Sequence, residues 1–186
     1  PVVRTLFSES ALVSSAFDYP SKLAMGHRRL SILDVSPAGH QPMSDPTARY
    51  WIVFNGEIYN FREVRVDLEL LGYRFKTGSD TEVILASYSE WQENCLSFFN
   101  GDFAFAIWDN KQKSLFCARD RIGIKPFYYI LENERFIFGS DIKTLIASGL
   151  YRPEPDPEGL YLAMAFGIAP RPITAFKGIR ALEQAH

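Results

Sequence analysis

The 186-residue chain has 20 Lys and Arg against 22 Asp and Glu, a formal net charge of −2, and 47% of its residues are hydrophobic. This composition excludes an intrinsically disordered chain, and the lack of a basic block argues against binding to nucleic acid or to an anionic membrane. No apolar stretch is long enough to span a membrane, and the start at Pro1 does not resemble a signal peptide. We expect one large globular domain, with the cytoplasm as the default compartment.

The cysteines and histidines give no metal-ligand pattern. Cys95 and Cys117 are far apart in the chain, and the three histidines do not cluster with them. Cys95 falls in a helix-like stretch and Cys117 in a strand-like one, so both are expected to be small buried residues rather than nucleophiles. The sequence therefore predicts no metal site.

Before residue 50 the chain is weakly patterned apart from one expected strand. Residues 26–34 read as a strand that ends in a loop, with Arg28 and Arg29 at its head. An arginine can clamp a carboxylate through two parallel hydrogen bonds. The residue pattern alone nevertheless favours a solvated edge for both arginines.

The apolar run at residues 50–54 predicts a strand that is buried on both faces. We expect this strand to stop at Asn55 and Gly56. Asn55 offers a carboxamide N–H, and Gly56 offers a backbone N–H with no side chain in front of it, so the pair could hold a developing oxyanion. An isolated Asn-Gly pair is more often just a turn. Both interpretations stay open on the residues alone.

A helix is expected to follow at once. Phe61, Val64 and Leu68 recur at helical spacing, and Gly72 supplies a left-handed stop. Asn60 is expected to cap the helix as the first half of a capping box.

A second helix is expected after a short strand at residues 73–77. Ser79 and Glu82 have the spacing of a capping box at its start. Asp80 lies between them, where an acidic side chain suits the helix dipole. The same carboxylate would also suit the ammonium group of a ligand.

The second half of the sequence predicts strands joined by turns. Residues 101–109 alternate large and small apolar side chains, which favours a strand buried on both faces, and residues 110–114 turn back into a partner strand. Residues 119–126 are expected to form a cross-braced loop rather than a phosphate cradle, because no Gly-Lys-Ser/Thr follows and Pro126 lacks a backbone donor. Further strands are expected near 127–130 and 135–139, helices at 141–148 and 156–166, and an irregular tail.

Six motifs carry a resemblance to a known family. They are Gly-His-Arg-Arg-Leu-Ser-Ile-Leu-Asp from residue 26, Gly-His-Gln-Pro-Met from 39, Phe-Asn-Gly-Glu-Ile-Tyr-Asn from 54, Ser-Asp-Thr-Glu-Val from 79, Gly-Asp-Phe-Ala-Phe-Ala-Ile-Trp-Asp from 101 and Ala-Arg-Asp-Arg-Ile-Gly-Ile-Lys-Pro-Phe-Tyr-Tyr from 118. In this order they resemble the glutaminase domain of glutamine-hydrolysing asparagine synthetases, a class II glutamine amidotransferase. The likeness runs from about Gly26 to the end of the chain.

The resemblance implies an α+β fold, the N-terminal-nucleophile hydrolase fold, a four-layer αββα sandwich of two antiparallel sheets. It implies one such domain over residues 1–186, which hydrolyses glutamine to glutamate and ammonia for asparagine synthesis by an ATP-dependent synthetase domain or subunit. No cofactor is expected in this domain, and ATP and Mg²⁺ are expected only in the synthetase. Oligomeric state is left open, a homodimer included.

The resemblance also assigns roles to particular residues. Asn55 and the Gly56 N–H match the oxyanion hole of the family, which raises that interpretation above the turn. Five further positions match residues that bind glutamine: Arg29 for its α-carboxylate, Asp80 with help from Glu57 for its α-ammonium, and Ile32 and Leu33 as backbone that lines the pocket.

Two features of the family are missing from the sequence. The family opens with Cys-Gly-Ile, whose thiolate attacks the amide carbon of glutamine, and it later carries His-Arg-Gly-Pro-Asp. Neither string is present, and Cys95 and Cys117 are interior. We therefore expect a chain that lacks its first strand, its nucleophile and the following synthetase domain, and that is inactive as given. The alternatives are a catalytically inactive glutaminase-like structural or regulatory domain, or an amidotransferase for a different acceptor.

Overall fold

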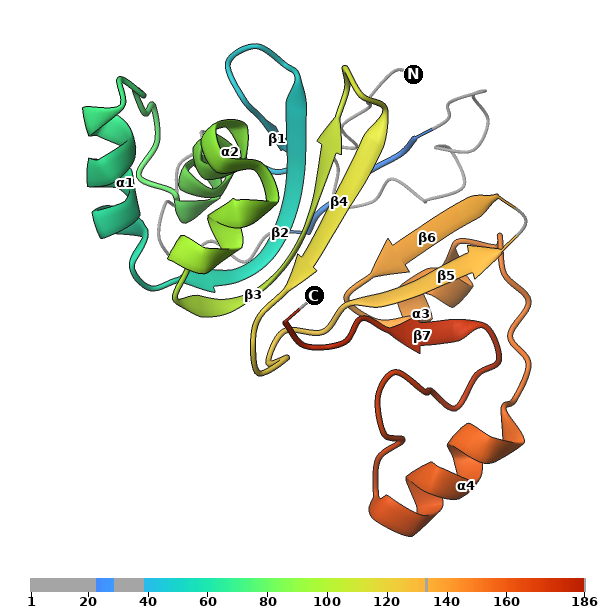
Figure 1. The fold of residues 1–186 in the computed structure, drawn as a ribbon. Coiled ribbons are helices and arrows are strands. Elements are labelled where there is room, and N and C mark those ends of the chain that lie inside the picture. Colours follow the sequence, from blue (N-terminus) through green and yellow to red (C-terminus); the bar gives the residue numbers. More distant parts are fainter. Residues whose placement is uncertain (1–22, 29–38, 133, 186) are drawn as a thin grey trace. The chain divides into compact units, whose positions relative to one another are not determined.

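The computed structural model describes residues 23–28, 39–132 and 134–185. The chain divides into two compact units, residues 1–118 and 119–186. Within the described ranges, no helix has both the length and the apolar character needed to cross a membrane. Figure 1 shows the elements of both units.

The first unit is a four-stranded antiparallel sheet with two helices on one face (Figure 1). Its elements are β1 (Met43–Ser44), β2 (Tyr50–Ile58), α1 (Phe61–Leu70), α2 (Asp80–Trp91), the 3-10 helix η3 (Gln92–Phe98), β3 (Gly101–Asp109) and β4 (Ser114–Arg119), whose last residue begins the second unit. The strand order is β1-β2-β3-β4, so the two long strands β2 and β3 are central.

The core of this unit lies between the sheet and the helices. Alternate residues of β2 and β3 face α1 and α2, because successive side chains of a strand point to opposite faces. The buried side chains of this face are Tyr50, Ile52, Phe54, Ile58, Phe103, Phe105 and Ile107, and the helices add Val64, Leu68, Val83, Ile84, Leu85 and Tyr88. Each large apolar side chain buried in this way stabilises the fold by roughly 1.5–3 kcal/mol.

The expectation that the central strand stops at Asn55 is wrong. β2 continues through Asn55 and Gly56 to Ile58, and every residue of it pairs with β3. Ile58 is fully buried, and its burial favours continued pairing over a turn. The Asn-Gly pair therefore lies inside a strand, and the turn interpretation is excluded.

Asn60 does not cap α1 as expected. Its side chain makes no capping hydrogen bond. Instead its Nδ2 donates to the Phe98 carbonyl at 2.9 Å, and its Oδ1 accepts from the Asn100 N–H at 2.9 Å. Asn60 thus ties the end of β2 to the segment that leads into β3.

Residues 73–77 form an irregular connection and not the expected strand. The Glu82 carboxylate accepts from the backbone N–H groups of Lys76 and Thr77, which competes with strand pairing. Ser79 is the N-cap of α2, as expected, and its hydroxyl accepts from the Thr81 N–H. The reciprocal half of the capping box is absent from the described contacts, because Glu82 reaches further back along the chain.

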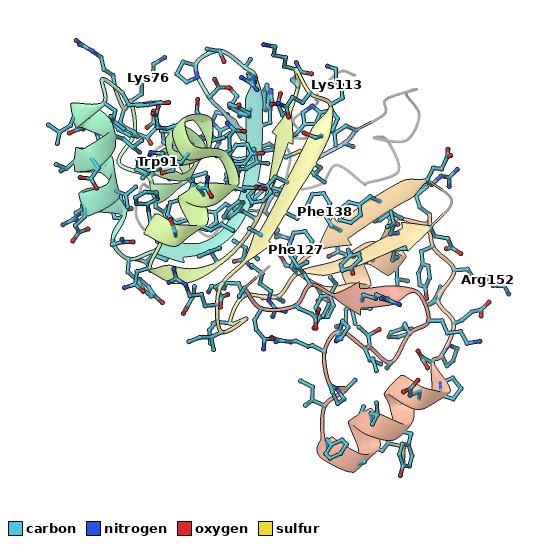
Figure 2. All side chains as sticks on the ribbon, in the orientation of Figure 1. Lys76, Trp91, Lys113, Phe127, Phe138 and Arg152 are labelled. Carbon is cyan, nitrogen blue, oxygen red and sulfur yellow. The ribbon has the colours of Figure 1, made fainter. Side chains whose placement is uncertain are left out.

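The second unit holds a three-stranded antiparallel sheet of order β6-β5-β7. Its elements are β5 (Tyr128–Glu132), β6 (Arg135–Gly139), α3 (Ile142–Ala147), α4 (Pro157–Phe166) and β7 (Ile179–Ala181). Phe127 and Phe138 stack with ring centroids 5.4 Å apart (Figure 2). The expectation of a wholly irregular tail is wrong, because residues 179–181 pair with β5.

The loop at residues 119–126 is cross-braced, as predicted. The buried Arg119 guanidinium donates to the carbonyls of Gly123, Lys125 and Leu182, each at 2.6 Å. The Asp120 carboxylate accepts three backbone N–H groups of the same loop. Burial acts to raise the pKa of Asp120, but these donors outweigh it and hold that pKa below its usual value.

Candidate functional site

The end of β2 presents two polar side chains on the sheet face that points away from the helical core. Asn55 and Glu57 alternate with Phe54 and Ile58, which belong to that core, so they face the opposite way. Opposite Asn55, β3 places Ala104, a small and buried residue. A small partner leaves room beside the Asn55 carboxamide, and no described residue hydrogen-bonds that group. The carboxamide is thus available as a donor.

Gly56 occupies a position that no other residue fits. Its φ is +143°, a conformation that side chains rarely adopt, and a Cβ built there would lie 2.1 Å from the Asp102 carbonyl oxygen of β3. The close approach of the two backbones explains why glycine stands here. It also leaves the backbone of Gly56 uncovered by a side chain of its own.

Asp80 begins α2 and reaches back to the end of β2. Its Oδ2 accepts from the Ile58 N–H at 3.1 Å, and only 4% of the residue is exposed. Burial raises the pKa of Asp80, and the nearby Glu57 carboxylate adds to the rise, while the N–H groups of Ile58 and Thr81 partly oppose it. The structure thus brings Asp80 to the same strand end as Asn55, Gly56 and Glu57.

Asp80 has no cationic partner among the described residues. The ion pairs among the described residues join Arg49 to Asp109, Arg65 to Glu69 and Lys177 to Glu154. A buried carboxylate without a counter-ion is costly, and burial is normally matched by a cation or by more hydrogen bonds. The arrangement can accept an ammonium group.

Gln41 is a positioning residue that the sequence interpretation missed. Its Oε1 accepts from the Phe54 N–H at 2.6 Å, and its Nε2 contacts the Thr81 hydroxyl at 3.4 Å. It therefore joins β2, one residue before Asn55, to the first turn of α2, one residue after Asp80. The motif from residue 39 contains Gln41, but no local pattern reveals partners 13 and 40 residues away.

Three of the predicted site residues, Arg29, Ile32 and Leu33, lie outside the described residues. Both cysteines lie within them. Burial raises the pKa of Cys95 and of Cys117 to about 12, so neither forms a thiolate readily. The expectation that neither is a nucleophile agrees with this chemistry.

A sequence profile described as a glutamine amidotransferase domain matches residues 14–186. The match spans most of the chain, and the chain therefore belongs to the glutamine amidotransferase domain family. This is the family that the six motifs indicate.

Curated relatives carry this region within longer proteins. The chain is 44% identical over 164 residues to asparagine synthetase [glutamine-hydrolyzing] 3 of Bacillus subtilis, with 87% of the chain and 26% of the relative covered. It is 42% identical over 170 residues to asparagine synthetase [glutamine-hydrolyzing] 1 of the same organism, with 91% and 27% covered. The chain thus spans about a quarter of the length of the curated relatives it matches.

Solved structures show the same fold. Glutamine phosphoribosylpyrophosphate amidotransferase from B. subtilis superposes with a TM-score of 0.52 at 24% identity, over 63% of this chain and 28% of that one. The likeness shows that the chain has the N-terminal-nucleophile hydrolase fold of α+β class, with two antiparallel sheets and helices, as the resemblance implied. The stacking of these elements into four layers stays a prediction.

Proposed function

We propose that this chain is the glutamine-hydrolysing part of an asparagine synthetase of the kind its relatives' names describe. It binds glutamine and releases ammonia, which a synthetase domain or subunit uses to make asparagine in the cytoplasm. The glutaminase part needs no cofactor, and ATP and Mg²⁺ serve the synthetase. The observation that carries the proposal is the buried Asp80 carboxylate, which has no cationic partner among the described residues and lies next to the Asn55-Gly56 strand end.

Each predicted site residue has a proposed role in binding. Asp80 accepts the α-ammonium of glutamine, and Glu57 adds negative potential beside it. Arg29 clamps the α-carboxylate through its planar guanidinium. The backbone of Ile32 and Leu33 lines the pocket.

The proposed chemistry is acyl transfer to a thiolate. The sulfur of an N-terminal cysteine in the complete protein attacks the side-chain amide carbon, and the carbonyl oxygen becomes an oxyanion held by the Asn55 carboxamide and the Gly56 N–H. The C–N bond then breaks, the nitrogen takes up a proton, and ammonia leaves. Water attacks the resulting thioester, which releases glutamate and restores the thiol.

Asp80→Asn tests the ammonium assignment in the complete protein. Loss of a hydrogen bond between charged groups is worth about 1.5–3 kcal/mol, so we expect the KM for glutamine to rise roughly 10–100-fold. Ammonia-dependent synthesis should be unchanged, because it bypasses this site. Glu57→Gln is the matched control and should raise KM less, since Glu57 acts at longer range. Equal loss of both synthetic activities would contradict the assignment.

Asp80→Asn is also expected to change stability. Whereas it weakens glutamine binding, it should make the fold more stable at neutral pH. Because the folded-state pKa of Asp80 is raised, the folded protein binds its proton more tightly than the unfolded chain does. Stability is therefore lost as pH rises through the raised pKa, and the ionised carboxylate is a net cost at neutral pH. Asp80→Asn should raise the Tm at pH 7 in the absence of glutamine, and the gain should vanish at acidic pH. A lower Tm at pH 7 would identify Asp80 as a stabilising helix-end acid.

A further inference from the structure

Helix α4 has the composition of a buried helix but lies exposed. Residues 159–170 contain no charged side chain. Five large apolar residues in this stretch are exposed, and we call them the α4 apolar surface: Leu160, Tyr161, Met164, Phe166 and Ile168. A helix that is apolar on several sides is normally covered, and a contiguous exposed apolar patch marks an interaction site.

The chain itself provides a comparison for a solvated helix. α1, in the first unit, also has ten residues, but five of them are charged: Arg62, Glu63, Arg65, Asp67 and Glu69. Two of its apolar residues, Val64 and Leu68, are buried, while Val66 and Leu70 are exposed but each follows a charged residue. In α4, by contrast, Glu158 is the only charged residue, and only Gly159 is buried. The difference indicates that α4, unlike α1, is built for contact on its outer side.

α4 is anchored firmly at one end. The backbone N–H of Asp156 donates to the Ala175 carbonyl at 3.0 Å, and Asp156 caps the helix. At Gly159 the helix backbone meets the chain so closely that a Cβ would lie 1.9 Å from the Thr174 carbonyl oxygen. The rest of the helix extends from this anchor, away from the β6-β5-β7 sheet of the same unit (Figure 1). The apolar surface therefore follows directly on an anchored helix start.

We propose that, in the complete protein, the α4 apolar surface packs against the polypeptide that the relatives carry beyond this region. The chain covers 26% and 27% of two of these relatives, so about three quarters of each has no counterpart here. A segment of the same polypeptide has a high effective concentration, which favours it over a second copy. The proposed occupant presents an uncharged, apolar face, because a charge opposite this surface would be desolvated without a partner.

The inference rests on the proposed function in one respect only, because that function identifies the covering polypeptide as the synthetase part. Its test reads accessibility and not activity, so failure of the glutaminase assignment would not affect it. Met164→Cys and Leu70→Cys are made separately in the complete protein. Met164 is 87% exposed in the structure, and Leu70, an apolar residue in the last turn of α1, is 82% exposed and serves as the matched control.

Each variant is alkylated with N-ethylmaleimide, and the modified peptide is quantified by mass spectrometry in native and urea-unfolded protein. The reaction of Cys95 and Cys117 with N-ethylmaleimide is slow in the native protein, because burial raises the pKa of each thiol to about 12. We expect residue 164 to be protected about tenfold or more by folding, while residue 70 reacts at close to its unfolded rate. Tyr161→Cys, 71% exposed in the structure, repeats the measurement if Met164→Cys does not fold.

Two outcomes would overturn the proposal. Equal reactivity of residues 164 and 70 in the native protein would mean that nothing covers the surface. Protection that disappears on dilution to the monomer, with the mass followed by light scattering, would assign the surface to a second copy. Protection that persists in a monomer supports the proposal.

Discussion

Asn55→Ala is expected to lower the kcat for glutamine hydrolysis by about 10²–10³ in the complete protein, which corresponds to roughly 2.7–4 kcal/mol. An oxyanion donor acts on charge that develops in the transition state, so KM should change little. Asn55→Asp should be at least as damaging, because a carboxylate would repel the oxyanion. Measurement of kcat and KM for glutamine checks both variants.

A defect in folding can be separated from a defect in catalysis. The backbone of Asn55 pairs with Ala104 in β3 whatever the side chain is, and no described residue bonds the carboxamide. Asn55→Ala should therefore change the free energy of unfolding by no more than about 0.5 kcal/mol. Near-normal kcat in a folded Asn55→Ala protein would disprove the oxyanion role, and a large fall in Tm would show that Asn55 is structural.

Gly56→Ala is expected to be the most damaging single substitution for the fold of the first unit. The new Cβ would lie 2.1 Å from the Asp102 carbonyl oxygen and 2.7 Å from the Phe103 Cα, both backbone atoms that cannot move without breaking the pairing of β2 and β3. The positive φ alone costs about 1–3 kcal/mol, and the collision adds to it. Urea unfolding should show the loss, and glutaminase activity should fall with it because β2 also carries Asn55.

Gly72→Ala is the matched control for this prediction. Gly72 also has a positive φ, +95°, but apart from its chain neighbours no atom of the described residues lies within 4 Å of the Cβ that an alanine would place there. This variant should lose roughly 1–2 kcal/mol from backbone strain alone. If Gly56→Ala proved no less stable than Gly72→Ala, the close approach of β2 and β3 would not constrain residue 56.

The parts of the fold that the sequence predicted are those with local causes. The apolar run at residues 50–54 and the alternating run at 101–109 indicated the two central strands. Burial on both faces calls for continuous apolar residues, and the second run departs from this only at Asp102 and Asp109, near its two ends. Ser79 and the Asp156-Pro157 pair marked helix starts, since a cap acts on the next two or three residues. Asn55, Gly56 and Asp80 were singled out as candidate site residues from two short motifs, each made of residues that are neighbours in the sequence.

The tertiary structure decided everything that depends on partners distant in the chain. β2 runs through the Asn-Gly pair because β3, some 50 residues later, offers it a continuous line of backbone partners. Asn60 leaves its expected cap for Phe98 and Asn100, and Gln41 reaches the first turn of α2. Residues 179–181 form a strand only because β5 is there to pair with. A side chain or a short segment forms the most favourable of several competing hydrogen bonds. The sequence alone shows which partners are available nearby in the chain. Only the folded chain shows which distant residues come close enough to compete with them.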